Sequence, residues 1–176
     1  LKIGGDNGAA KGRKSLQLQS DLQGISMLLP APLDKPASEA WPLSLTLEMP
    51  IVGQAFTARL GDLLSLQGRL PGPATALSAR MNFGSRGGLT DMPPADGLQI
   101  GGEVGSLDVG GWIGLLNAGG TGGVLFQGME LDVNSLEMAG RDFPDIHLDL
   151  VPQQDAMSIS ISGVTLEGEV SVPRTE

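Results

Sequence analysis

The chain has 176 residues and a formal net charge of −9, because 20 Asp and Glu outnumber 11 Lys and Arg. It contains no Cys, which excludes disulfide-stapled modules, thiolate metal sites and Cys nucleophiles. The acidic balance argues against a nucleic-acid partner, which would require a basic face to neutralise phosphates. With two Trp, four Phe and no Tyr, the apolar residues are almost entirely aliphatic.

The chain begins at Leu1 rather than Met and shows no charged segment followed by an apolar one, so we expect no secretory signal in it. We therefore expect residues 1–176 to be a single strand-rich module excised from a longer chain. No apolar run approaches the length of a membrane-spanning helix.

The dominant pattern is a strict alternation of apolar and polar residues, which is typical of strands with one apolar face. It begins at Pro42–Met49 and recurs over 56–60, 64–70, 77–83, 98–104, 145–150 and 157–161. The apolar-face residues that we single out are Leu43, Leu45, Leu47, Met49, Phe56, Ala58, Leu60, Leu77, Ala79, Met81, Phe83, Ile146, Leu148, Leu150, Met157, Ile159, Ile161, Val164 and Leu166.

The alternation changes phase at Asn134-Ser135 and at Ser162-Gly163, where we predict bulges or tight turns. Gly- and Pro-rich turn signals separate the predicted strands, with short connections between them. The pattern predicts an all-β fold of about ten strands in a mostly antiparallel meander sheet.

Two segments depart from this pattern. Leu107–Asn117 carries Trp112, Leu115 and Leu116 at helical spacing, and Asp108 is placed to cap a short helix there. The Pro-rich segment Pro30–Trp41 predicts an extended loop without hydrogen bonds between two strands.

Residues that carry chemistry are few. His147 is the one histidine. It is either a metal ligand or acid–base group, or a member of a solvated ladder of charges with Asp145 and Asp149. The charge ladder is favoured, because a single His rarely makes a specific metal site. The Gly-rich stretches lack the Gly-Lys-Ser/Thr pattern of a phosphate loop. We expect no catalytic residues, no metal and no cofactor.

The aliphatic face itself has two interpretations. It is either an ordinary core or a surface reserved for an apolar ligand, and periodicity alone favours the core. The scarcity of aromatic residues and of helix to cover such a sheet weakens that preference.

Three stretches of the chain resemble a known family. The segment Ser20–Trp41, with Ser20-Asp21-Leu22, Gly24, Leu29–Leu33 and Lys35-Pro36, resembles the YhdP family of AsmA-like envelope proteins. The later stretches 97–116 and 131–172 are similar to the following elements of that family, in the same order.

The resemblance implies a curved sheet with a hydrophobic inner groove, in a periplasmic protein anchored to the inner membrane of double-membrane bacteria. It implies transfer of phospholipid between the inner and outer membranes, with the apolar-face residues solvating acyl chains. The implied partners are phospholipid acyl chains and adjacent modules of the same chain, with membrane contact only through parts outside these residues. The alternative is a structural β-rich envelope module with an ordinary core, acting as a spacer or partner platform. A hydrolase of envelope polymers would need a converging carboxylate pair, for which the sequence offers no basis.

Overall fold

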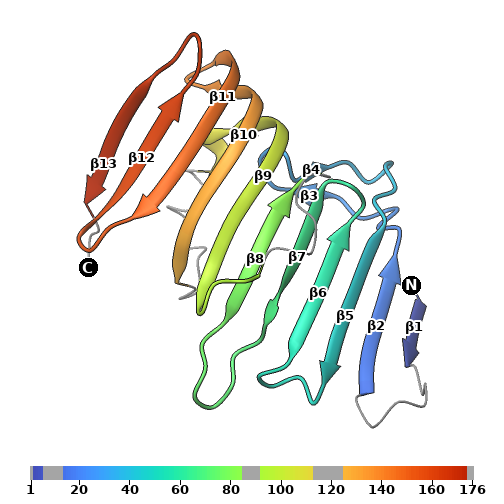
Figure 1. Ribbon diagram of the computed structural model, residues 1–176. Helices are drawn as coiled ribbons and strands as arrows, with labels where there is room; N and C mark the ends of the chain where they lie inside the picture. Colours follow the sequence, from blue (N-terminus) through green and yellow to red (C-terminus); the bar gives the residue numbers. More distant parts are fainter. Residues whose placement is uncertain (1, 6–13, 85–91, 113–124, 174–176) are drawn as a thin grey trace.

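One large open sheet dominates the molecule. The computed structural model describes residues 2–5, 14–84, 92–112 and 125–173, and places eleven strands in this sheet and two in a small second sheet (Figure 1). The spatial order of the eleven strands follows the chain. This confirms the predicted all-β class with a mostly antiparallel sheet.

The strands of the large sheet are β1 (Lys2–Gly5), β2 (Lys14–Ser20), β5 (Leu43–Met49), β6 (Ala55–Leu60), β7 (Leu64–Arg69), β8 (Ser78–Phe83), β9 (Gly97–Asp108), β10 (Phe126–Met138), β11 (Arg141–Pro152), β12 (Ala156–Ser162) and β13 (Gly168–Pro173). The small sheet pairs β3 (Met27–Leu28) with β4 (Asp34–Lys35). The alternation in the sequence therefore located most strands correctly, while β1, β2, β13 and the two short strands of the small sheet were missed. Val164 and Leu166, which were predicted to lie on the apolar face of a strand, are in the connection between β12 and β13 instead.

The prediction of a simple antiparallel meander is wrong for three central strands. β8 and β9 are parallel, and so are β9 and β10. Parallel neighbours need crossover connections, which hairpins cannot supply. Alternation of apolar and polar residues is the same in either strand direction, and this is why it could not predict the parallel pairs.

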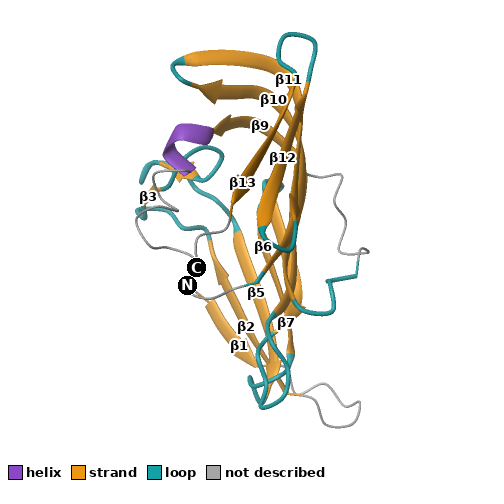
Figure 2. Cartoon of the chain, turned by 90° about the vertical axis from the view of Figure 1, so that its left-hand side faces the viewer, coloured by secondary structure: helices purple, strands orange, loops and turns teal. Residues whose placement is uncertain are grey.

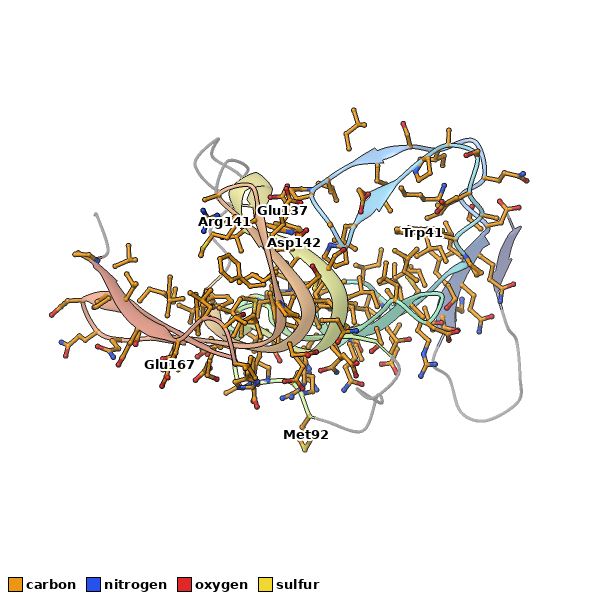
Figure 3. All side chains as sticks on the ribbon, turned by 90° about the horizontal axis from the view of Figure 1, so that it is seen from above. Trp41, Met92, Glu137, Arg141, Asp142 and Glu167 are labelled. Carbon is orange, nitrogen blue, oxygen red and sulfur yellow. The ribbon has the colours of Figure 1, made fainter. Side chains whose placement is uncertain are left out.

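The two crossovers leave the sheet on different faces. Before β9, Ser78 Oγ donates a hydrogen bond of 2.7 Å to Pro94 O from the polar face. Met92, in this connection, lies on the opposite side of the sheet from β3 and β4 (Figure 3). After β9, the chain turns into a helix on the apolar face. The helix therefore covers part of the apolar face, while the connection before β9 lies on the polar face.

At Asn134-Ser135 the structure shows neither the predicted bulge nor a tight turn, but a bend that three strands share. Consecutive buried residues are three positions apart in β9 (Val104, Leu107) and in β10 (Val133, Leu136). The pairing stays in register, because β11 makes the same step between Ile146 and Phe143. The ends of β9, β10 and β11 consequently curl over toward the side that carries the helix (Figure 2).

The second phase change, at Ser162-Gly163, is a turn between β12 and β13. A Cβ on Gly163 would lie 2.5 Å from Ile146 Cδ1. A side chain here would press on a buried core residue and would also lie 3.0 Å from Asp145 O, which favours glycine at this position.

The helix begins later than predicted. β9 extends through Asp108, and residues 109–112 are helical. Asp108 caps this helix as predicted, since Gly111 N donates to Asp108 Oδ1 at 2.8 Å. The remainder of the predicted helix, residues 113–117, lies outside the described residues. The same holds for the Gly-rich stretch at 119–123 and for most of the one at 84–88.

The Pro-rich segment is not the unbonded loop that its prolines predicted. Residues 21–42, which we call the strap, contain the β3–β4 ladder and several hydrogen bonds, among them Leu33 N to Pro30 O at 3.0 Å. The strap leaves the sheet after β2 and stands over its apolar face (Figure 2). Proline removes backbone donors of its own, but it leaves the neighbouring amides free to pair.

The core lies between the curled strands and these covering elements. Its buried members come from β8 to β11: Phe83, Val104, Leu107, Leu131, Val133, Leu136, Ile146 and Leu148. Leu33 of the strap and Val109 and Trp112 of the helix pack against them. The strap and helix thus act as the second layer that a sheet of this size needs in order to bury its apolar side.

Candidate functional site

A continuous row of apolar side chains crosses ten strands of the sheet. Residues that pair directly across neighbouring strands share a face and contact each other. Following the register from β2 to β13 gives the row that we call the apolar lane: Leu18, Leu45, Ala58, Leu66, Met81, Ile100, Met129, Leu150, Ile159 and Val170. The sequence shows alternation within each strand, whereas the lane is a property of the register between strands.

The lane is only partly covered. Its members from Leu18 to Ile159 are half-buried, and Val170 is 56% exposed. At about 4.8 Å between strands, ten strands extend the lane over about 43 Å. This length exceeds the roughly 30 Å hydrocarbon core of a bilayer. The lane is therefore long enough to hold extended acyl chains end to end.

The rows beside the lane, toward the curled ends, are sealed. Two positions along β10 from Met129, Leu131 is 2% exposed, and Val133 and Leu136 are 2% and 0% exposed. The equivalent residues of β9 and β11, such as Val104 and Ile146, are equally buried. The apolar face therefore contains two zones: a dry core under the strap and helix, and an open lane next to it.

The predicted apolar-face residues differ in where they lie and how far they are buried. Leu45, Ala58, Met81, Leu150 and Ile159 belong to the lane. The buried ones are Phe56, Leu60, Ala79, Phe83, Ile146 and Leu148, and the half-buried ones are Leu43, Leu47, Leu77, Met157, Ile161 and Leu166. Met49 and Val164 are 41% and 95% exposed. Whether any of them contacts lipid stays a prediction.

The predicted set omitted lane residues that the register brings in. Leu18 was missed altogether, although Leu16 and Leu18 alternate with Gln17 and Gln19 in β2. Leu66, Ile100, Met129 and Val170 complete the row. The alternation in β2 was the signal that could have extended the set toward the N-terminal side.

The opposite face of the sheet is polar. Arg80 Nη1 donates to Gln99 Oε1 at 3.1 Å, and Arg80 Nε donates to Asn82 Oδ1 at 3.3 Å. Ser158 Oγ donates to Glu169 Oε1 at 3.0 Å. These polar contacts within and between strands satisfy one another, so this face contrasts with the lane directly behind it.

His147 lies on this polar face. Its Nδ1 is 2.9 Å from Asp132 Oδ1 on the neighbouring strand, and the two side chains are 42% and 63% exposed. Its partner is thus Asp132 rather than the flanking Asp145 or Asp149. Among the described residues, no group of three or more His, Asp or Glu is placed to hold a metal ion. The exposure of both side chains agrees with the solvated setting that the sequence favoured, although the predicted partners were Asp145 and Asp149.

Two open-sided cavities flank the upper end of the sheet near the strap. One, of about 470 Å³, lies between strap residues such as Pro32, Asp34 and Trp41 and the β6–β7 turn at Leu60–Leu63. The other, of about 710 Å³, is lined by Gln19, Ser20, Asp21, Pro42, Leu43, Ser44, Arg59 and Gly61. Trp41 Nε1 donates to Glu39 Oε2 at 3.0 Å, so the indole is anchored within the strap itself. In the part of the chain that the structure describes, no helix has the length and apolar character to cross a membrane.

A comparison with protein families shows which family this chain belongs to. The family described as YhdP protein matches residues 2–176, almost the entire chain. The chain belongs to the YhdP family. The comparisons with curated proteins and with solved structures found no match. Membership in the YhdP family indicates an AsmA-like lipid-transport protein of the bacterial envelope, a class not known for enzymes.

The motifs that carried the YhdP resemblance meet in space. Trp112 Nε1, in the segment 97–116, donates a hydrogen bond of 2.8 Å to Ala31 O in the Leu29–Leu33 motif. These residues are 81 positions apart in the chain. The most recognisable part of the family pattern therefore builds the contact between strap and helix, while the lane is built from ordinary alternating strands.

Proposed function

We propose that this chain forms part of a periplasmic, bridge-like conduit that moves phospholipid between the inner and outer membranes along the apolar lane. The observation that carries the proposal is the lane itself: one half-buried or exposed apolar residue from each of ten neighbouring strands, in register. YhdP family membership supports lipid as the apolar ligand.

The chemistry needed is partition rather than reaction. Burial of one methylene is worth about 0.8 kcal/mol, so a dozen methylenes on the lane would gain about 10 kcal/mol. A gain of this size offsets the free-energy cost of taking those methylenes out of a bilayer. A uniform aliphatic surface holds every step along the lane at similar energy, which allows sliding, and the headgroup stays in water.

A structural module with an ordinary core is the second candidate. The sealed zone supports it, since Leu136 is 0% exposed and Ile146 1% exposed. The lane does not fit it, because a spacer would gain stability by covering the half-exposed residues from Leu18 to Ile159. An experiment on the lane therefore separates the two candidates.

The first prediction concerns Leu45, a lane residue that lies outside the core cluster of β8–β11. Leu45→Asp should lower the phospholipid that copurifies with the protein by about tenfold or more, because a carboxylate in an acyl-chain path must be desolvated. Mass spectrometry of extracted lipid measures this loss. Thr46→Asp is the matched control, since Thr46 is the next residue on the same strand and faces the other side.

A photoreactive amino acid at Leu47 tests contact directly in cells. Leu47 pairs with Leu16 and Phe56 on the apolar face next to the lane. We expect a covalent adduct with the mass of a phospholipid at position 47 and none at position 46. Normal lipid content in Leu45→Asp, together with no adduct at position 47, would favour the structural module.

A further inference from the structure

The strap is internally braced by a buried lysine. Lys35 is 2% exposed, and its Nζ donates to Leu22 O at 2.8 Å, Ile25 O at 2.8 Å and Pro36 O at 3.1 Å. These three acceptors come from both arms of the strap. A buried ammonium that loses its partners is costly, so the strap is held in one shape.

The base of the strap is closed as well. Trp41 N donates to Asp21 O at 2.7 Å, and Gly24 N donates to Ala37 O at 2.9 Å. These bonds join the outgoing and returning ends of the excursion. The strap therefore behaves as a compact element on the sheet rather than as a free loop.

The strap is also attached to the helix that follows β9. Besides the bond from Trp112 Nε1 to Ala31 O, the Pro30 ring lies so close to the backbone of the helix that a Cβ on Gly111 would be 2.9 Å from Pro30 Cβ and Cγ. Leu33 packs on the same buried cluster as Val109 and Trp112. Lifting the strap would break the hydrogen bond and expose these side chains and the cluster beneath them.

We propose that the strap and the helix are a permanent wall of the groove, which confines acyl chains to the apolar lane and keeps them out of the sealed rows. The inference rests on the proposed function and adds to it a fixed limit on where the acyl chains can lie. A lid that opened to admit lipid would have to break the Trp112–Ala31 bond and the packing of Leu33 at each opening. A wall that never opens instead keeps the accessible apolar surface at a constant width along the lane.

Cysteine accessibility tests the wall, because residues 1–176 contain no Cys and each substitution creates the one thiol within them. Met129→Cys places it in the lane, and Val133→Cys places it four residues along the same strand in the sealed zone. The probe is a fatty acid with a maleimide at its methyl end, applied to the intact protein in envelope preparations. We expect Met129→Cys to react at least tenfold faster than Val133→Cys.

The outcomes distinguish the two proposals. If both thiols react at similar rates, acyl chains reach the sealed rows and the wall is overturned, while the lipid conduit stands. If neither thiol reacts, the conduit itself fails. Val→Cys changes side-chain volume little, which keeps the sealed-zone variant folded.

A disulfide between strap and helix gives an independent test. In Pro30→Cys/Gly111→Cys, the Cβ positions start 2.9 Å apart, which is shorter than the usual 3.5–4.5 Å, and the Cβ at position 111 would clash with Asp108 Oδ2. The bond therefore requires the Asp108 side chain and the strap to shift, and the oxidised and reduced forms of the same variant are compared so that this shift is shared as far as possible. We expect the phospholipid content of this variant to agree within twofold between its oxidised and reduced forms. A severalfold loss of lipid on oxidation, restored by reduction, would show that the strap must open and would overturn the wall.

Discussion

At the scale of single residues, glycines let the sheet hold its two buried phenylalanines. Phe56 is paired with Gly68 and Phe83 with Gly102, so each large ring has a residue without a side chain directly across from it. Both rings are buried, at 8% and 6% exposed. A Cβ on Gly102 would come within 2.1 Å of Phe83 O, and its φ is +112°. The strand therefore requires glycine at this position for both space and backbone conformation.

This argument predicts opposite effects for two glycines of the same strand. Gly102→Ala should destabilise the protein by about 2 kcal/mol or more, because of the backbone clash and the positive φ. Gly105→Ala should be neutral or stabilise by up to about 1 kcal/mol, since a Cβ there meets nothing within 4 Å. Denaturant unfolding of both variants measures the difference. Equal stabilities would show that β9 adapts its backbone at Gly102.

At the scale of elements, the β10–β11 hairpin turns on Ala139 and Gly140. Both have positive φ, +54° and +71°, as a type I′ turn requires. Alanine is unfavourable there because its Cβ crowds the neighbouring carbonyl in the left-handed region. The sequence shows no Asn-Gly signal at this position, and for this reason the turn was not among the predicted ones. The pairing of two long strands imposes the conformation on a residue that does not favour it.

Relief of this strain is a testable outcome. Ala139→Asn should stabilise the protein by about 1 kcal/mol, since Asn tolerates the left-handed region and is preferred in such turns. The midpoint of thermal unfolding should rise accordingly. Ala74→Asn, in the exposed loop between β7 and β8, is the control and should change little. A lower midpoint for Ala139→Asn than for the control would contradict the type I′ assignment.

At the scale of the whole molecule, the sheet is unevenly supported. The buried cluster draws on β8 to β11, whereas β5 has no fully buried residue although it is hydrogen-bonded on both sides. Local stability follows buried apolar contacts as well as backbone hydrogen bonds. The lane thus runs from a firmly packed half of the sheet into a half whose apolar face is less covered.

Hydrogen exchange should reveal this gradient. Amides of β10 should exchange at least tenfold more slowly than those of β5, although both strands are paired on each side. The comparison removes edge effects, because neither strand lies at an edge of the sheet. Equal protection in the two strands would indicate that the sheet opens as one cooperative unit, and that the sealed zone adds no local stability.

Local sequence patterns were sufficient for the all-β class, most strand positions, the cap at Asp108 and the family, because alternation and capping are local and the motifs are contiguous. The remaining features follow from the tertiary fold. The parallel pairs, the lane and the sealed zone depend on which strands become neighbours and in what register, and alternation within a strand carries no such information. The role of Lys35 and the meeting of Trp112 with Ala31 depend on the fold of the strap over the sheet. The choice between core and ligand surface therefore had no single answer in the sequence, since the apolar face is core where the strap and helix cover it and open where they do not.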